Sequence, residues 1–510
     1  MVRRYLRLAG ALALAGGSLL AGGAPVAATA NIAIGPMLHS KFMSATQPPT
    51  QDQCEAAFLA PCYVPSQIQT AYNEQPLFDS GITGAGQTIV IVDSFGSPTI
   101  KADLAVFDAE FGLPAPPSFK IIQPAGPVPA YDPTDANGDV GWAEETSLDV
   151  QWAHAMAPGA SILLVETPVA ETEGTVGFPQ IVKAENYVIN HHLGQVISQS
   201  FDATEGTFPS PASIYGLRSA YLNAFKNHVT VLAATGDTGV TNYSNAAGTL
   251  LYTHPVVGWP ATDPLVTAVG GTQLALLADG SRTQADRVWN DGSKYDFVDA
   301  FTGSPGPTAL ATGGGKSAVF PRPSYQDGVA SVTGNHRGVP DISMSGSCTG
   351  LVDVYLGFPG VPAGWYVFCG TSESTPLFAG IVALADQLAG HSLGLINPAL
   401  YILSAAHAPG IVDVTKGNNG VSFLQPLLVK LLGYNAGPGY DLASGVGTVN
   451  AALFVPALVQ AAATLPGMLL AAASVSVMSL PSVDSILLLR IAYASMRMTY
   501  AVAVKGQAHE

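Results

Sequence analysis

Between residues 88 and 234 the chain alternates short β-branched runs with helical stretches, and this alternation limits the fold more than any other feature. Strands that alternate with helices usually pair in parallel, through right-handed crossovers that place helices on both faces of the sheet. We therefore expect an α/β fold with a mostly parallel sheet. The predicted strands are Thr88–Asp93, Ser161–Val165, Gln195–Ser198 and Val229–Ala234. The predicted helices are Thr99–Phe111, Trp142–Met156, Ile181–His192 and Ser213–Asn227.

A serine lies at the start of a later apolar helical run. Gly370–Pro376 reads Gly-Thr-Ser-Glu-Ser-Thr-Pro and leads into Leu377–Ala385, so Ser372 is expected at a helix N-terminus. Free backbone N–H groups and the helix dipole favour negative charge there, such as an oxyanion that forms beside the hydroxyl. The pattern indicates a nucleophile, although an ordinary serine N-cap would give the same sequence. The preceding stretch 235–370 is rich in Gly, Ser, Thr and Pro, as long loops around a cleft would be.

Two acids lie one turn apart in the predicted helix Trp142–Met156. Glu145 and Asp149 are at positions i and i+4, so they share one helix face and repel each other when both are charged. Apolar neighbours indicate that this face is partly buried, where desolvation and repulsion raise carboxyl pKa values. Such a pair can share a proton. The alternative is a solvated acidic helix start that complements the dipole.

A third acid follows a predicted strand. Asp237 lies in a Gly-Asp-Thr-Gly turn just after Val229–Ala234. The carboxyl ends of parallel strands form the edge where α/β proteins place ligands and catalytic groups. An aspartate between glycines is by itself usually a turn residue, so its position is the stronger argument for a role.

Together these segments resemble the sedolisin family of serine-carboxyl peptidases. The family's Glu-x-x-x-Asp helix matches Glu145 and Asp149, its Gly-Asp-x-Gly turn matches 236–239, and its Gly-Thr-Ser-x-x-x-Pro matches 370–376. The resemblance covers roughly residues 64–454 and implies a subtilisin-like α/β fold, with a mostly parallel sheet and helices on both faces in a single large catalytic domain. Further matches in family order are Gly313–Gln326, Arg337–Asp341 and Ala436–Asp441.

The resemblance implies a role for each residue. Ser372 would form an acyl-enzyme, with Glu145 as general base and Asp149 as its proton-sharing partner. Asp237 would donate to the oxyanion in its protonated form, because an ionised carboxylate only accepts hydrogen bonds. A glutamate can act as a base in acid, where a histidine is already protonated. We therefore expect a peptidase that cleaves proteins or peptides in acid. An endopeptidase is favoured over a tripeptidyl-peptidase, although the family includes both.

A Ser-His-Asp peptidase of the subtilisin type is the competing hypothesis. Asp93 ends the strand Thr88–Asp93, where subtilisins carry the aspartate of their triad. The first histidine after it, His154, lacks flanking glycines and does not share the helix face of Glu145 and Asp149. The glutamate mechanism is therefore favoured, and Asp93 is left near the site without a role. An inactive, calcium-binding protein of the same fold is the other alternative, because fold alone does not establish activity.

The resemblance also implies one structural calcium ion. Carried over by position, the ligands would be the side chains of Asp413 and Asp441 and the backbone carbonyls of Val414, Gly437 and Gly439. Ca²⁺ prefers such carboxylate and carbonyl oxygens in loops. Without the family, the same loops would be interpreted as turns.

The N-terminus predicts secretion. Residues 1–30 have a basic start, an apolar run and a small-x-small end, as a signal peptide does. Residues 31–63 would then be a short segment in place of the family's large pro-domain. Residues 455–510 form an apolar extension of unknown role, for which membrane anchoring is the less favoured interpretation because prolines and alanines weaken its hydrophobicity.

Cysteines and charge limit the environment and the partners. The cysteines form two local pairs, Cys54 with Cys62 and Cys348 with Cys369, which an exported protein can oxidise to disulfides. Other pairings and a buried free thiol stay open. The net charge of -16 at pH 7 argues against nucleic acid as a partner, because there is no basic excess to neutralise phosphates. We expect a monomer.

Overall fold

The predicted strands form the centre of one sheet. The computed structural model describes residues 39–136, 138–302 and 306–464, all within the unit Ala33–Glu510. The strands of the main sheet are β3 (Thr88–Ser94), β4 (Phe119–Ile122), β5 (Ser161–Thr167), β6 (Val196–Gln199), β8 (Thr230–Ala234), β10 (Thr267–Gln273), β11 (Arg287–Val288) and β14 (Ile342–Ser345). Their order is β11-β10-β8-β6-β3-β5-β4, with β14 also paired to β10. Within this described sheet β10 and β11 pair antiparallel and the other pairs are parallel.

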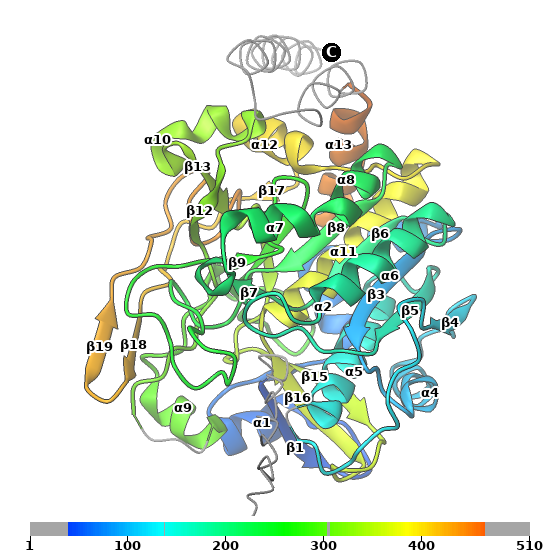
Figure 1. The fold of residues 1–510 in the computed structure, drawn as a ribbon. Helices are drawn as coiled ribbons and strands as arrows, with labels where there is room; N and C mark the ends of the chain where they lie inside the picture. Colours follow the sequence, from blue (N-terminus) through cyan, green and yellow to red (C-terminus); the bar gives the residue numbers. More distant parts are fainter. Residues whose placement is uncertain (1–38, 137, 303–305, 465–510) are drawn as a thin grey trace, which may run out of the picture. The chain divides into compact units, whose positions relative to one another are not determined.

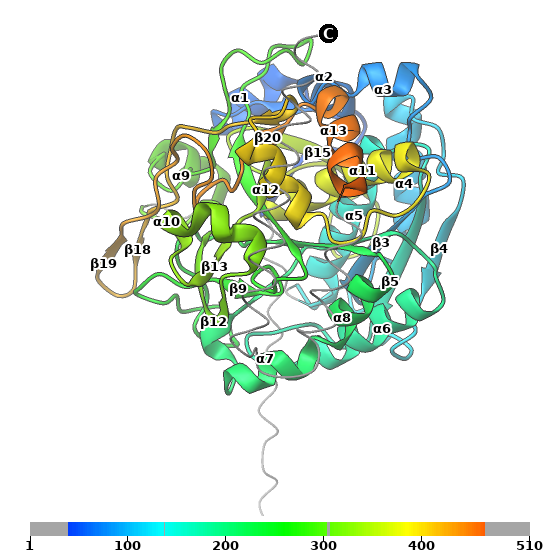
Figure 2. The same cartoon turned by 90° about the horizontal axis from the view of Figure 1, so that it is seen from above.

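Helices cover both faces of this sheet, as Figures 1 and 2 show. Successive side chains of a strand point to opposite faces. On β3, Ile89 and Ile91 therefore enter one core, and Val90 and Val92 enter the other. The first core includes side chains of α4 (Ile100–Phe111), α5 (Asp139–Met156) and α11 (Thr371–Ala389), and the second those of α6 (Phe178–Asn190) and α8 (Ser219–Lys226). The predicted α/β fold with a mostly parallel sheet is confirmed.

Two local predictions differ from the structure. The helix expected over 213–227 is broken into α7 (Pro211–Leu217) and α8, with Arg218 between them. The guanidinium of Arg218 is bound to buried Asp263, which fixes the chain at the break. The stretch expected to consist of long loops also supplies β10 and β14. Their β pattern is weak, because β10 contains two adjacent glycines and β14 contains two serines.

A smaller sheet holds the segment that leads into Ser372. It contains β1 (His39–Ser44), β2 (Cys62–Tyr63), β15 (Leu351–Leu356) and β16 (Gly364–Cys369), in the order β1-β16-β15-β2. Residues 39–44 and 62–63 therefore share a described sheet with the strand that precedes the Gly-Thr-Ser motif. The predicted disulfide Cys54–Cys62 is formed and ties β2 to the helix α1 (Gln51–Phe58).

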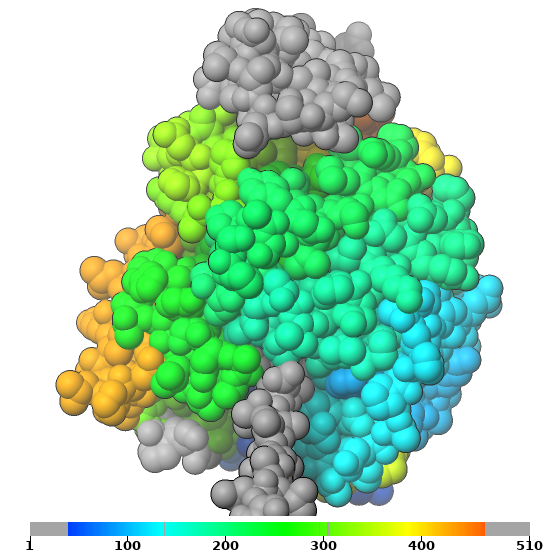
Figure 3. Space-filling view, viewed as in Figure 1, coloured from blue at the N-terminus to red at the C-terminus, as the bar shows by residue number. Residues whose placement is uncertain are grey.

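The C-terminal part of the described chain consists of two helices and small hairpins. After α12 (Asn397–Ala405), the hairpin of β18 (Val421–Leu424) and β19 (Leu428–Leu431) lies at the edge of the face in Figure 3. The helix α13 (Ala451–Ala463) packs against α11, and its later part, from Val455, contains the first residues of the expected extension. The rest of that extension and the expected signal peptide lie outside the described residues. Within the described ranges, no helix combines the length and apolarity needed to cross a membrane.

Candidate active site

Ser372 lies in the first turn of α11, next to Asp237. The helix begins at Thr371, and its N-cap, Gly370, has φ 134°, a conformation that glycine adopts readily. A β-carbon at Gly370 would come within 2.5 Å of Asp237 Oδ2. Glycine therefore allows the turn before the serine to approach this carboxyl group closely.

Glu145 and Asp149 are fully buried where α5 packs against α11. Among the described residues, neither carboxyl oxygen of Glu145 has a hydrogen-bond partner. Burial, followed by the charge of Asp93, raises the pKa of Glu145 well above its ordinary value. The hydroxyl of Ser372 lies close enough to oppose this rise, although its geometry falls short of a full hydrogen bond. Buried, unpartnered acids with such shifts are typical of functional sites. The three-dimensional arrangement brings together the serine and the acid pair that the sequence singled out.

Asp149 is held by a residue that the sequence analysis missed. Its Oδ1 accepts a hydrogen bond from Ser200 Oγ at 2.9 Å, while its Oδ2 lacks a partner in the described chain. Burial first, then Asp93 and Glu145, raises the pKa of Asp149. Ser200 directly follows β6, so its place at the carboxyl edge of the sheet was the available signal.

Asp93 belongs to the same cluster, although the sequence analysis gave it no role. It is buried near the end of β3, and both of its carboxyl oxygens are unpartnered in the described structure. Burial raises the pKa of Asp93 to about 7, while the hydroxyl of Thr146 lowers it. No ion pair within the described residues involves Asp93, Glu145 or Asp149. Ionising all three of these buried carboxyl groups would be energetically unfavourable, so at least one of them stays protonated.

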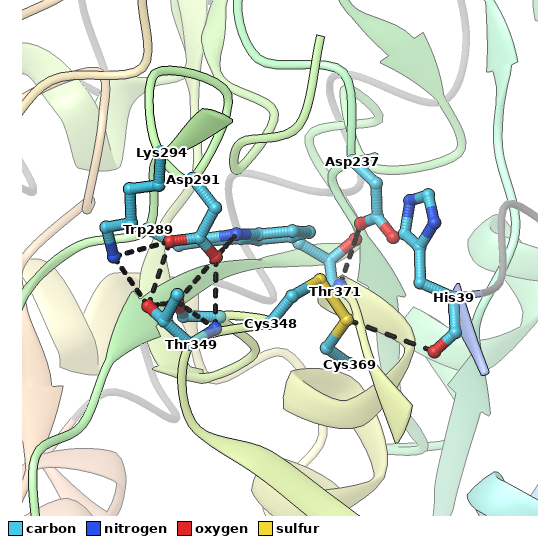
Figure 4. The surroundings of a disulfide bond; sticks show 10 residues. His39, Asp237, Trp289, Asp291, Lys294, Cys348, Thr349, Cys369 and Thr371 are labelled. Carbon is cyan, nitrogen blue, oxygen red and sulfur yellow. Dashed lines mark hydrogen bonds and ion pairs between the residues drawn. A yellow bond between two sulfur atoms is a disulfide. The ribbon is translucent and has the colours of Figure 1, made fainter. Parts of the chain in front are cut away.

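Asp237 is buried and has one free oxygen. Its Oδ1 accepts hydrogen bonds from the backbone N–H and the hydroxyl of Thr371, both at 2.8 Å, and its Oδ2 is unpartnered among the described residues. Figure 4 shows this contact. Burial raises the pKa of Asp237 to about 7, against the two hydrogen bonds from Thr371. The group is therefore protonated in acid and able to donate a hydrogen bond.

The second disulfide braces the segment before Ser372. Cys348 and Cys369 are bonded, as predicted, and Cys369 directly precedes Gly370 (Figure 4). Beside it, Asp291 accepts hydrogen bonds from Trp289 Nε1 at 2.8 Å and Lys294 Nζ at 2.7 Å. The covalent link and this hydrogen-bond network limit the movement of the turn that positions the serine.

His154 points to a different set of partners. Its Nε2 lies 2.8 Å from the carbonyl oxygen of Pro114 and 3.3 Å from Asp108 Oδ1. Burial lowers the pKa of His154 to about 4. These contacts agree with the expectation that His154 lies off the face of Glu145 and Asp149.

The two loops expected to bind calcium lie side by side and are joined by a hydrogen bond. Asp413 Oδ2 accepts from Gly439 N at 2.8 Å, and Asp441 Oδ2 accepts from Gly437 N at 3.0 Å. Across the described residues, no three His, Cys, Asp or Glu side chains cluster as a metal site. The expected set has only two carboxylates, with backbone carbonyls completing it, and these hard oxygen donors fit Ca²⁺ chemically.

Comparison with known proteins identifies the family. The model of the subtilase family matches residues 135–408, more than half of the chain. The chain belongs to the subtilase family. Within it, the predicted resemblance to the sedolisin family is confirmed by the relatives and the solved structure that the chain matches. It is 34% identical over 396 residues to kumamolisin of Bacillus sp. (strain MN-32), an alignment that covers 76% of this chain and 62% of kumamolisin.

Two further comparisons concern fold and reaction type. The solved structure of Pseudomonas sedolisin, a serine-carboxyl proteinase complexed with two molecules of pseudo-iodotyrostatin, is 27% identical with a TM-score of 0.60. That match covers 78% of the present chain and 98% of the solved chain. Human tripeptidyl-peptidase 1 is 29% identical over 60% of this chain and 50% of its own length. The present chain thus spans about half to three fifths of these curated relatives.

Proposed function

We propose that this protein is a serine-carboxyl peptidase that hydrolyses peptide bonds in acid through an acyl-enzyme on Ser372. Ser372 Oγ attacks the scissile carbonyl carbon, and its proton passes to the ionised carboxylate of Glu145. Asp149 shares a proton with Glu145 and so keeps the pair singly charged. Protonated Asp237 donates a hydrogen bond to the oxyanion that forms on the substrate.

The second half of the reaction reverses these proton transfers. Glu145 returns its proton to the leaving amine, so the peptide bond breaks and the acyl group stays on Ser372. Water then gives a proton to Glu145, attacks the acyl carbon and releases the carboxyl product. Ser372 recovers its proton in that step, and the enzyme is regenerated.

The unpartnered, buried Glu145 beside the Ser372 hydroxyl is the observation that carries this proposal. Burying an acid without a hydrogen-bond donor costs stability, so a purely structural residue at this position would be unfavourable. Charge repulsion among Glu145, Asp93 and Asp149 favours a state in which some of these carboxyl groups are protonated and others ionised. Both forms are needed, because the base must be ionised while its partner holds the shared proton.

We further propose endopeptidase action, secretion and a monomer, with residues 64–454 as the catalytic domain. Both endopeptidases and tripeptidyl-peptidases are among the relatives, so the choice between them depends on a cleavage assay. The two disulfides support an oxidising compartment. Analysis of the products from a denatured protein would distinguish internal cuts from sequential release of tripeptides.

We also propose that one calcium ion is held by Asp413 and Asp441, with the backbone carbonyls of Val414, Gly437 and Gly439. When bound, it would neutralise the two carboxylates and join the loops that carry them. Chelation should therefore lower the thermal midpoint. If calcium had been present at 100 times its Kd, its removal would reduce the free energy of unfolding by about 2.7 kcal/mol. An unchanged midpoint after confirmed metal removal would reject this site.

The decisive experiment compares the purified protein with its Ser372→Ala variant on a denatured protein substrate from pH 2 to pH 9. Cleavage that is greatest in acid and absent in the variant is expected. Serine-dependent cleavage that is greatest near neutral pH would favour a histidine base instead. No cleavage at any pH, from protein whose folding is verified by a cooperative thermal transition, would favour the inactive calcium-binding protein.

A further inference from the structure

A second group of acids lines a small cavity beside Ser372. The cavity has a volume of about 30 Å³, and its wall includes Ser372 and Asp237. Three more acids, Glu171, Glu173 and Asp202, also line it. Lysine, arginine and histidine are absent from the described residues of this wall. A substrate bound for attack by Ser372 must therefore pass next to a concentration of carboxyl groups without a basic partner.

Glu171 supplies an unpartnered group in this cavity. Glu171 is only 5% exposed, and its Oε2 has no hydrogen-bond partner among the described residues. Burial raises the pKa of Glu171 well above its ordinary value, and Asp202 raises it further. A buried acid without a donor is unfavourable unless a ligand supplies the missing partner.

Asp202 is placed by two features of the fold. Its Oδ2 accepts a hydrogen bond from Asn242 Nδ2 at 2.9 Å. A β-carbon at Gly258 would lie 1.7 Å from the same oxygen, so the absence of a side chain there makes room for the carboxyl group. Gly258 is paired with Thr204 across the short strands β7 (Ala203–Thr204) and β9 (Gly258–Trp259). The position of Asp202 is therefore set by backbone pairing as well as by its hydrogen bond.

Glu173 is fixed on the same wall. It accepts hydrogen bonds from the backbone N–H of Thr204 and the hydroxyl of Thr207, both at 2.8 Å. Burial raises the pKa of Glu173 to about 8 and that of Asp202 to about 7. The acids that face Asp202 are Glu171, Glu173 and Asp237, whose pKa values its charge raises. In the empty cavity they hold protons, and an entering cation would let Asp202 release one and form an ion pair.

We propose that this cavity is the subsite for a basic side chain of the substrate, lysine or arginine, close to the scissile bond. Asp202 is the ion-pair partner, and Glu171 and Glu173 supply hydrogen-bond acceptors beside it. The volume accommodates a group of about the size of a water molecule, such as an ammonium group or the tip of a guanidinium. The aromatic ring of Phe201 on the same wall offers an apolar surface to the methylene stem. This inference rests on the peptidase function proposed above.

The test uses a positional-scanning peptide library with lysine, arginine, norleucine or glutamine at each position around the scissile bond. At one position, lysine or arginine should raise kcat/KM at least about tenfold over norleucine, as expected for a charge-assisted hydrogen bond. Asp202→Asn, and independently Glu171→Gln, should bring this ratio close to one. The matched control is Glu110→Gln, which removes an exposed acid at the end of α4 and should keep the ratio.

Each remaining outcome rejects either the subsite alone or the peptidase function together with the subsite. Cleavage without a basic preference at any position, or a ratio that survives in both folded cavity variants, would reject the subsite and leave the peptidase function standing. Cleavage of no peptide by the folded protein would reject the peptidase function and the subsite with it.

Discussion

Two fully buried groups of charged side chains in this domain are arranged in opposite ways. Asp341 accepts hydrogen bonds from Arg337 through both of its carboxyl oxygens. It also accepts from the hydroxyl of Tyr401 and the backbone N–H of Ala268, both at 2.8 Å. In the cluster of Glu145, Asp149 and Asp93, by contrast, five of the six carboxyl oxygens lack a partner among the described residues.

The difference separates a structural group from a functional one. A buried charge with a counterion and several donors is compensated in the ground state, and removing one partner exposes the other to an uncompensated burial cost. The acid cluster is left uncompensated, so its protons are easily redistributed. That property suits the general base proposed above, which would exchange a proton with Ser372 during the reaction.

The largest effect is expected from Glu145→Gln. The amide cannot accept the proton of Ser372, so turnover should fall by about 10² to 10⁴, the usual contribution of a general base. Stability should not fall, because the variant removes one acid from an uncompensated cluster. Turnover and thermal unfolding measured on the same preparation check both parts. A large loss of stability would show that the cluster is structural after all.

Arg337→Met should do the reverse and reduce stability. It leaves the carboxylate of Asp341 buried without its cation, which typically costs about 3–5 kcal/mol. Denaturant unfolding measures the change, and Lys316→Met on the exposed face of β12 (Gly315–Pro321) is a matched control. A change no larger than that of the control would remove the contrast between the two groups.

Substitutions of Asp237 test whether its proton is the functional one. Asp237→Ala should lower kcat by about 10² to 10³, the usual effect of losing one oxyanion donor. Asp237→Asn should lose less, because an amide donates at any pH. Activity that depends on this proton should decline as pH rises through about 7, the pKa to which burial raises Asp237, and Asp237→Asn should weaken that decline. Equal losses in both variants would argue against a donor role.

Measured per pH unit, the pH dependence of stability gives the smallest signal. Burial raises the pKa values of Asp93 and Asp237 to about 7, so between about pH 4 and pH 7 the folded state holds protons that the unfolded chain has released. Stability from these groups is therefore present in acid and is lost as pH rises through that window, by about 1.4 kcal/mol per pH unit for each proton held. Thermal scans across the window should show a shallower slope in Asp93→Asn. An unchanged slope would mean that Asp93 releases its proton as readily in the folded state as in the unfolded chain.

Local pattern was enough to predict much of the fold. The apolar strand Thr88–Ser94 and the helix Asp139–Met156 carry strong periodic or compositional signals, and both lie where they were expected. β10 was missed because Ala268, Gly270, Gly271 and Gln273 weaken its β pattern, although pairing with β8, β11 and β14 supports it. Propensity is a local quantity, while this strand depends on its neighbours.

The sequence by itself determined which chemical groups are available and their local spacing: a serine at a helix start, two acids on one helix turn and an aspartate after a strand. Only the tertiary structure decided that Asp93 and Ser200 join the acid pair and that Glu171 and Asp202 share a cavity beside Ser372. The physical reason is that a carboxyl pKa depends on burial and on charges within a few ångströms, which come from segments far apart in the chain. Such distances are set when the sheet and its helices pack.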